Sequence, residues 1–386
     1  MFDFDSVIDR RGTGSEKWEK YAGRDILPMW VADMDFRSPP VVVEALRRRT
    51  EHGVFGYTKA SPGTVEAVVG MLARDFGWAI DPAWLVWLPG LVSGLNVTCR
   101  SVGEEGDDVL TLVPVYPPFL SAPRLSRRGL VRVPLHESAN RWGIDFERLE
   151  AAVTPRTRLF MLCNPHNPVG RVFDPEELQR LAELSLRCGM IVCADEIHCG
   201  LVLDPEKRHL PFAALGPEVA ERTITLMAPS KTFNLAGLGC SFAVIPSESL
   251  RRSFVQAKAG IVPMVNPYGY AAAEAAYRDG EEWRRALIDY LRGNRDTLAE
   301  ALKRMPGGLS MAAVEGTYLA WIDVRNTGLD ESVRFFEEAG VGLQDGREFD
   351  GPGFVRLNFG CPRAVLREAL ARMGRALEKR FAGAGS

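Results

Sequence analysis

The chain has 386 residues, of which 46% are hydrophobic, so it can bury one large core and a second, smaller one. Its 47 basic and 50 acidic residues nearly cancel, which excludes a bulk electrostatic preference for nucleic acid or an anionic membrane. No apolar stretch approaches the roughly 20 residues that span a bilayer, and the acidic start Met1–Asp5 has no apolar run of a secretory leader behind it.

Two helices are predicted within the first 80 residues, each started by a Ser-Pro pair. Ser38-Pro39 places a serine at the N-cap and a proline at the first helical position, and Gly53 marks the end of this helix. Ser61-Pro62 repeats the pattern for a second helix that ends near Gly77. The segment before residue 50 therefore leads into a helical region.

Seven short apolar runs predict the strands of one sheet. They are rich in Val, Ile and Leu without polar alternation, and helices such as Asp174–Cys188 separate them, which is typical of a mostly parallel sheet buried on both faces. The predicted strands are Leu85–Leu88, Val109–Val113, Leu130–Val133, Arg158–Cys163, Met190–Ala194, Thr223–Met227 and Ser241–Ile245. The seven cysteines form no C-x-x-C pair and several lie inside these runs, so we expect reduced thiols and a cytoplasmic protein.

The pattern changes after about residue 260, where strand-like runs become rare. A long helix is expected from Glu281 to about Lys303, followed by a strand-like run Thr317–Val324 and a final helix from Arg363 to Phe381. We therefore predict an α/β fold with a large domain over residues 51–280 and a small α+β domain over residues 281–386. Residues 1–50 are expected to join the small domain.

Polar features follow three of the predicted strands, where parallel sheets bind ligands. Asn164–Gly170 offers a side-chain amide, or is only a tight turn. Asp195–His198 offers a carboxylate that needs a cation when buried, although a helix cap or a structural ion pair would also explain it. A metal site at Asp195, His198 and Cys199 is not expected, because the spacing matches no standard zinc pattern.

The third feature, Ala228–Gly237, contains Lys231 between small and apolar residues. Burial would lower the pKa of this lysine and make its amine nucleophilic, although a surface loop remains the alternative. An acid for a ring nitrogen, an amide for a ring oxygen and a lysine for an aldehyde are together what pyridoxal 5′-phosphate requires. Gly90–Gly94, between a strand and a helix, is a weaker candidate for the phosphate.

These strings resemble the fold-type I, class I/II aminotransferase-like enzymes that use pyridoxal 5′-phosphate. The resemblance covers essentially the whole chain and is sharpest to the MalY/PatB group of cystathionine β-lyases. The strings that carry it are Val7–Thr13, Pro28–Phe36, Gly53–Thr58, Asn164–Gly170, Ala194–His198, Ser230–Leu238 and Phe354–Phe359. It implies the fold-type I architecture, a mostly parallel seven-stranded sheet with a smaller α+β domain.

The resemblance assigns a role to individual residues. Lys231 is implied as the catalytic residue, which holds the cofactor as an aldimine and moves a proton at the substrate Cα. Asp195 is implied as the partner of the pyridine nitrogen, and Asn167, helped by His198, as the donor to the 3′-oxygen. Arg356 is implied to bind the substrate α-carboxylate as a bidentate fork.

Further implied roles concern the edges of the site. Tyr116 is implied to stack on the ring, and Tyr57 to contact the phosphate of the neighbouring subunit. Trp30 and Asn167 are implied to contact the substrate. The phosphate is implied to be bound by Ser230, Gly90, Leu91 and Val92. The resemblance thus implies a homodimer with shared sites. Two positions depart from it: Gly200 stands where an acidic residue is expected, and Gly239 where many relatives carry a larger residue.

The reaction is not decided by the cofactor, which makes the Cα–H bond acidic whatever follows. The resemblance favours elimination from an L-cysteine conjugate such as L-cystathionine, giving a thiol, pyruvate and ammonia. Transamination is the alternative, and a regulator that binds the cofactor is a third. A nucleotide-binding enzyme is not expected, because neither G-x-G-x-x-G nor G-x-x-x-x-G-K-[ST] follows a predicted strand.

Overall fold

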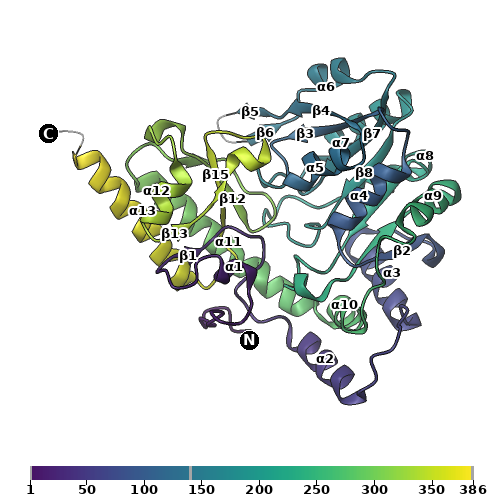
Figure 1. Cartoon of the computed structure of the whole chain (residues 1–386), viewed down its shortest axis with the longest axis horizontal. Coiled ribbons are helices and arrows are strands. Elements are labelled where there is room, and N and C mark those ends of the chain that lie inside the picture. Colours follow the sequence, from purple (N-terminus) through teal and green to yellow (C-terminus); the bar gives the residue numbers. More distant parts are fainter. Residues whose placement is uncertain (1, 139–140, 384–386) are drawn as a thin grey trace.

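The computed structural model describes residues 2–138 and 141–383, which form a larger and a smaller lobe (Figure 1). The larger lobe contains a seven-stranded sheet in which β10 runs antiparallel to both neighbours and the remaining pairs are parallel. In spatial order the strands are β2 (Leu85–Leu88), β10 (Ser241–Val244), β9 (Thr223–Met227), β8 (Ile191–Asp195), β7 (Thr157–Cys163), β3 (Asp108–Val113) and β4 (Gly129–Pro134). All seven strand predictions are confirmed to within one or two residues.

Both faces of this sheet are covered by helices. Along β7, Leu159 and Met161 pack into one apolar cluster, whereas Phe160 and Leu162 pack into another on the opposite face. This explains why the strands lack polar alternation. The helices of this lobe are α2 (Pro40–His52), α3 (Pro62–Phe76), α4 (Leu91–Ser101), α5 (Pro117–Leu125), α6 (Phe146–Ala152), α7 (Pro175–Arg187), α8 (Pro217–Ala220), α9 (Glu248–Lys258) and α10 (Pro267–Asp279).

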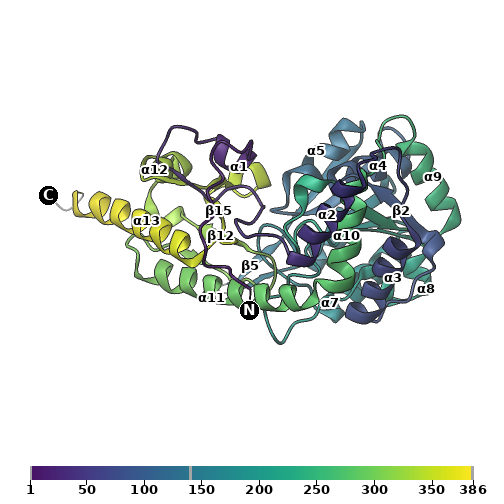
Figure 2. The same cartoon turned by 90° about the horizontal axis from the view of Figure 1, so that it is seen from below.

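The smaller lobe is built on a four-stranded antiparallel sheet in the order β11 (Ser310–Met311), β12 (Leu319–Asp323), β15 (Phe354–Asn358) and β14 (Gln344–Asp345). Its helices are α11 (Glu281–Arg304), α12 (Ser332–Glu338) and α13 (Arg363–Gly383), and α11 reaches it from the larger lobe (Figure 2). Near the N-terminus, α1 (Glu16–Glu19) precedes β1 (Leu27–Pro28), which pairs with β13 (Val341–Gly342). The domain boundaries at residues 50 and 280 stay a prediction.

The helix starts show one wrong prediction. Ser61 caps α3 as predicted, because its Oγ accepts a hydrogen bond from the Thr64 N–H (2.9 Å). Ser38 does not cap α2, which begins at Pro40 with Pro39 at the N-cap. The Ser38 hydroxyl donates instead to the carbonyl oxygen of Asn234 (3.0 Å), so a tertiary contact replaces the local one. None of the described helices is long and apolar enough to cross a membrane.

Candidate active site

A cavity of about 150 Å³ lies at the carboxyl ends of β7, β8 and β9, the place that the sheet rule predicts. Segments distant in sequence meet there, and the start of α4 closes one side. Its lining includes most of the predicted site residues, namely Gly90, Leu91, Val92, Tyr116, Asn167, Asp195, His198, Ser230 and Lys231. The structure therefore brings these residues together around one space.

Lys231 follows β9 and points its amine at the backbone of the N-terminal segment. Its Nζ donates a hydrogen bond to the carbonyl oxygen of Ala32 (2.7 Å). Burial, together with the nearby Arg356, lowers the pKa of Lys231 to about 8, although Asp33 and Asp195 act in the opposite direction. The free, nucleophilic amine is therefore far more populated near neutral pH than it is for an ordinary lysine.

Asp195 is the last residue of β8 and is buried. Its carboxylate accepts a hydrogen bond from the Ile197 N–H (3.1 Å). Burial, together with the neighbouring Glu196, raises the pKa of Asp195 to about 7, although the Ile197 N–H and Lys231 act in the opposite direction. A buried carboxylate with so little compensation offers a place for a cation, and a protonated ring nitrogen would meet that need.

Arg356 enters from β15 of the smaller lobe and connects to the cavity through Asn167. Its Nη1 donates to Asn167 Oδ1 (3.0 Å), and its Nη2 donates to the carbonyl oxygen of Trp30 (2.9 Å) and to Gln344 Oε1. Because Arg356 occupies the amide oxygen, Asn167 offers its NH₂ group as a donor to a ligand. The Arg356 Nε is buried without a partner among the described residues, so the guanidinium retains a free donor.

His198 adds a second buried polar atom without a partner in the described part of the chain, its Nδ1. Burial lowers the pKa of His198 well below its usual value, so the ring is neutral. Tyr116 lies at the N-cap of α5, and its N–H donates to the Asn167 carbonyl (3.0 Å). A ligand in the cavity therefore meets a neutral imidazole, an aromatic ring and an amide within one enclosed space.

The start of α4 and Ser230 form the end of the cavity suited to an anion. Gly90 is the N-cap of α4, and the first N–H groups of a helix lack intrahelical partners. Gly239, one of the two departures, has φ +58°, and a Cβ there would lie 3.2 Å from the Pro89 carbonyl oxygen. The backbone beside this end therefore favours glycine over a larger residue.

Besides Arg356, which reaches the cavity through Asn167, two predicted residues lie outside the cavity lining. Tyr57 is fully exposed, in the segment between α2 and α3. Trp30 contacts Arg356 through its backbone, whereas its indole N–H donates to the Lys17 carbonyl (3.1 Å) and its ring lies 4.5 Å from Lys20 Nζ. Within this chain neither side chain contributes to the cavity.

A segment that the sequence analysis did not place crosses the site; we call residues 30–36 the strap. Asn358 Nδ2 donates to the carbonyl oxygens of Val31 (2.6 Å) and Asp33 (2.7 Å), and Asn234 Nδ2 to that of Met34 (2.9 Å). These two amides lie just after Arg356 and Lys231 in sequence. The strap therefore connects the loop that carries Lys231, in the larger lobe, to β15, which carries Arg356, in the smaller lobe.

The strap is also anchored by buried charges. Asp35 accepts hydrogen bonds from Lys17 Nζ (2.7 Å), Arg10 Nη1 (2.7 Å) and Trp18 Nε1 (3.0 Å). Asp33 pairs with Arg10 as well (2.8 Å). These contacts give a physical reason for two of the N-terminal strings, Val7–Thr13 and Pro28–Phe36, to occur together.

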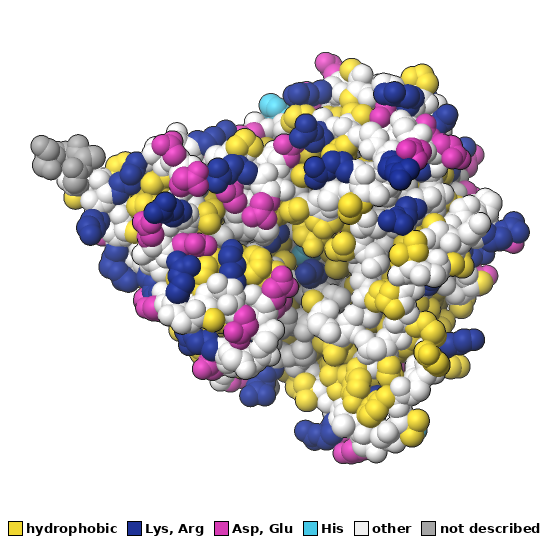
Figure 3. All heavy atoms as spheres, viewed as in Figure 1, with side chains coloured by type: hydrophobic (Ala, Val, Ile, Leu, Met, Phe, Trp, Pro, Cys, Tyr) yellow, Lys and Arg dark blue, Asp and Glu magenta, His cyan; other side chains and the backbone are white. Residues whose placement is uncertain are grey.

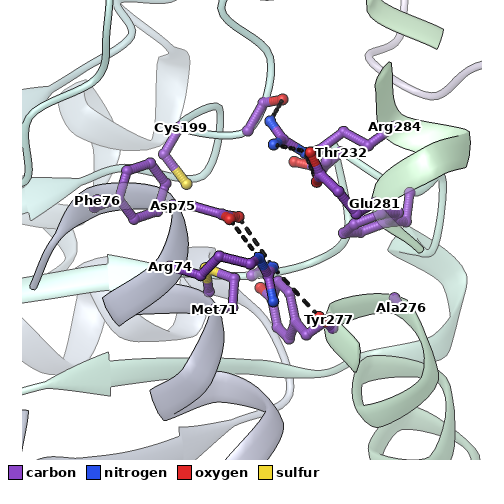
Figure 4. Close-up of a pocket in the computed structure, with 13 residues that line it drawn as sticks. Met71, Arg74, Asp75, Phe76, Cys199, Thr232, Ala276, Tyr277, Glu281 and Arg284 are labelled. Atoms are coloured by element: carbon purple, nitrogen blue, oxygen red, sulfur yellow. Dashed lines mark hydrogen bonds and ion pairs between the residues drawn. The ribbon is translucent and has the colours of Figure 1, made fainter. Parts of the chain in front are cut away.

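A second, small chamber lies beside Thr232, next to Lys231 in sequence (Figure 4). Gly200, the other position at which the chain departs from the resemblance, lines it. A Cβ on Gly200 would lie 2.6 Å from Thr232 Oγ1, so a larger side chain there requires Thr232 to move. The carboxylates beside this chamber come instead from Asp75 and Glu281, which pair with arginines of their own helices. Its volume of about 20 Å³ suits one water molecule.

Comparison with known proteins gives consistent matches over nearly the full chain. The sequence model "Aminotransferase class I and II" matches residues 24–373. "Cystathionine beta-lyase PatB" of Bacillus subtilis (strain 168) is 39% identical, covering 97% of this chain and 100% of PatB. Among solved structures, OvoB has a TM-score of 0.95 at 47% identity (97% and 99% covered). Cystalysin from Treponema denticola, which contains a pyridoxal 5′-phosphate cofactor, has a TM-score of 0.95 at 31% identity (98% and 99% covered).

Proposed function

Because the chain belongs to the class I and II aminotransferase family, with PatB among its full-length relatives, we propose that it is a pyridoxal 5′-phosphate-dependent carbon–sulfur β-lyase. It cleaves L-cystathionine or a related L-cysteine S-conjugate to a thiol, pyruvate and ammonia. The observation that carries this proposal is the single cavity that joins Lys231, Asp195 and Asn167 and meets Arg356 through Asn167.

The residues present fit the cofactor. The cavity offers an under-compensated buried acid at Asp195, an unpartnered imidazole nitrogen at His198 and a helix start at Gly90. When bound, the cofactor withdraws electrons from the substrate and makes its Cα–H bond acidic. Lys231 holds the cofactor aldehyde, Asp195 keeps the ring nitrogen protonated, and Asn167 with His198 binds the ring's 3′-oxygen.

The chain's own residues then position the substrate and move its proton. Arg356 binds the α-carboxylate, which orients the Cα–H bond toward the amine of Lys231. With its pKa near 8, Lys231 accepts that proton at neutral pH. The thiolate leaves Cβ and takes up a proton, and one water hydrolyses the remaining enamine to pyruvate and ammonia. Tyr116 packs on the ring, and Ser230 with the backbone of residues 90–92 holds the phosphate.

The protein acts as a homodimer in this proposal, with Tyr57 reaching the phosphate of the neighbouring subunit. Hydrophobic side chains gather on the face over α2 and α10 (Figure 3). Exposed apolar side chains on α2 and in the loops beside α2 and α10 include Val43, Val54, Phe55, Ile261 and Met264. A second copy would cover such a face. All seven cysteines are free thiols, in keeping with the cytoplasmic location that we propose.

The test offers purified protein L-cystathionine, and in parallel an amino acid with a keto acid. We expect pyruvate and a free thiol in equal amounts from the first, and loss of both in Lys231→Ala. Amine exchange that depends on the keto acid and releases no thiol would instead establish an aminotransferase. Absence of both reactions would contradict the proposal and leave a regulator that binds the cofactor.

A further inference from the structure

Tyr318 is a buried tyrosine beside the catalytic amine to which the proposed reaction assigns no role. It stands just before β12, after Thr317, whose φ of +73° is rare for a β-branched residue. Thr317 Oγ1 accepts a hydrogen bond from the Leu319 N–H (3.1 Å), and the Thr317 N–H donates to the Leu201 carbonyl (2.9 Å). Surrounding hydrogen bonds thus hold a strained backbone that fixes where Tyr318 points.

The Tyr318 hydroxyl and the Lys231 amine donate to the same atom. Tyr318 Oη lies 2.9 Å from the carbonyl oxygen of Ala32, and Lys231 Nζ lies 2.7 Å from it. Asn358 binds the carbonyls on either side, those of Val31 and Asp33, so the strap holds this oxygen in place. A carbonyl oxygen has two lone pairs, and both are occupied here.

We propose that Tyr318 is a positioning residue that limits how strongly the Ala32 carbonyl holds the proton of Lys231. A hydroxyl that donates to a carbonyl oxygen draws electron density from it, which leaves less negative charge for the ammonium form of the lysine. Tyr318 therefore favours the free amine, the form that binds the cofactor and accepts the substrate proton. This inference rests on the proposed function of Lys231.

Other charged and titratable groups also face Lys231, and their effects must be held constant. They are Asp33 on the strap, Asp195 on β8, His198 in the turn after β8 and Arg356 on β15; Tyr318 itself precedes β12. Replacing only the tyrosine hydroxyl leaves the other four unchanged. A shift in the protonation of Lys231 then reports on the shared carbonyl.

The test measures how fast cofactor-free protein takes up pyridoxal 5′-phosphate as a function of pH, followed by the visible absorbance band. Comparison with the wild type cancels the cofactor's own ionisations. In Tyr318→Phe we expect the midpoint of the pH profile to rise by about half a unit, a three-fold loss of free amine below the midpoint. With 3-fluorotyrosine at position 318, a stronger donor, we expect the midpoint to fall.

Tyr21→Phe is the matched control, because it removes another largely buried hydroxyl, which donates to Glu337 Oε1 (2.7 Å), and should leave the profile unchanged. Unchanged midpoints in both Tyr318 proteins would overturn the inference, even if Tyr318→Phe melts at a lower temperature. Should Tyr318→Phe fail to fold, the fluorotyrosine protein, which keeps every native atom but one hydrogen, still decides. A wild type that takes up no cofactor would overturn the proposed function and the inference with it.

Discussion

Burial moves the pKa values of the acid and the base of the site toward each other. It lowers the pKa of Lys231 to about 8 and raises that of Asp195 to about 7. In the cofactor-free protein both groups therefore change protonation near neutral pH, where general acid–base chemistry is most effective. The same isolation from water makes Asp195 a source of instability until a cation reaches it.

Asp195→Asn tests how much the buried Asp195 carboxylate destabilises the cofactor-free protein. Between about pH 4 and 7 the folded state keeps a proton on Asp195 that the unfolded state releases, so rising pH lowers the free energy of unfolding of the wild type. Asparagine does not titrate. We therefore expect the stability of the wild type relative to Asp195→Asn to fall by on the order of 4 kcal/mol across this window.

Guanidinium unfolding of both proteins at the two ends of the window measures the difference, with the cofactor removed throughout. The shift of Lys231 does not interfere, because a lysine whose pKa is lowered to about 8 destabilises the fold by a constant amount below that pH and changes stability with pH only above it. A stability difference that is the same at both pH values would show that Asp195 is not held in its protonated form.

Sequence reasoning located Lys231, Asp195 and Asn167 because each lies within four residues after a run that reads as a buried strand, and strand ends of a parallel sheet meet at one edge. It could not find Tyr318 or the Ala32 carbonyl. A backbone acceptor has no residue type of its own, and nothing local distinguishes a tyrosine that points into the site. Only Thr317, a threonine with positive φ, marks the place, and φ is not visible in a sequence.

At the scale of elements, the strap depends on buried ion pairs more than on local structure. Lys17 and Asp35 are almost completely buried, and Asp35 also pairs with Arg10. Breaking a buried pair leaves an uncompensated charge, which costs more than loss of an exposed pair. The strap should therefore be the most charge-sensitive element near the site.

Asp35→Asn is expected to lower the free energy of unfolding by about 3 kcal/mol, because it leaves the buried Lys17 with only the more distant carboxylate of Asp33 (3.8 Å). Glu44→Gln is the control, since it removes an exposed partner of Arg47 on α2 and should change stability by less than about 0.5 kcal/mol. Chemical denaturation of both variants checks the contrast. Equal effects would mean that the strap is not anchored by these charges.

The elements themselves were largely predictable, and the exceptions are informative. The seven strands were recognisable because most of their residues are apolar without strict polar alternation, and turn residues bound them. The start of α2 was not, because Ser38 binds the Asn234 carbonyl nearly 200 residues away. The strap was not predictable for the same reason. The side-chain amides of Asn234 and Asn358, distant in sequence, give it a conformation that its own residues do not specify.

At the scale of the whole molecule, the exposed apolar face over α2 and α10 (Figure 3) is where we place the second subunit. Phe55 is 54% exposed and lies in the segment that carries Tyr57. We expect Phe55→Asp to shift the protein toward monomer and to weaken cofactor binding about ten-fold, because a buried unpaired charge disfavours the interface.

Leu125→Asp is the matched control, since Leu125 is 65% exposed on α5, far from α2 in Figure 1. Sedimentation of both variants measures the oligomeric state, and titration with pyridoxal 5′-phosphate measures affinity. If Phe55→Asp and Leu125→Asp behave alike, the second subunit does not bind this face.

The most direct test of the central claim is to trap the cofactor on its lysine. The chain has eight lysines, so borohydride reduction of protein loaded with pyridoxal 5′-phosphate, followed by peptide mass mapping, can distinguish them. We predict one phosphopyridoxyl group per chain, on Lys231, and none in Lys231→Ala. A group on another lysine, or no group in a wild type that is folded and saturated, would contradict the account.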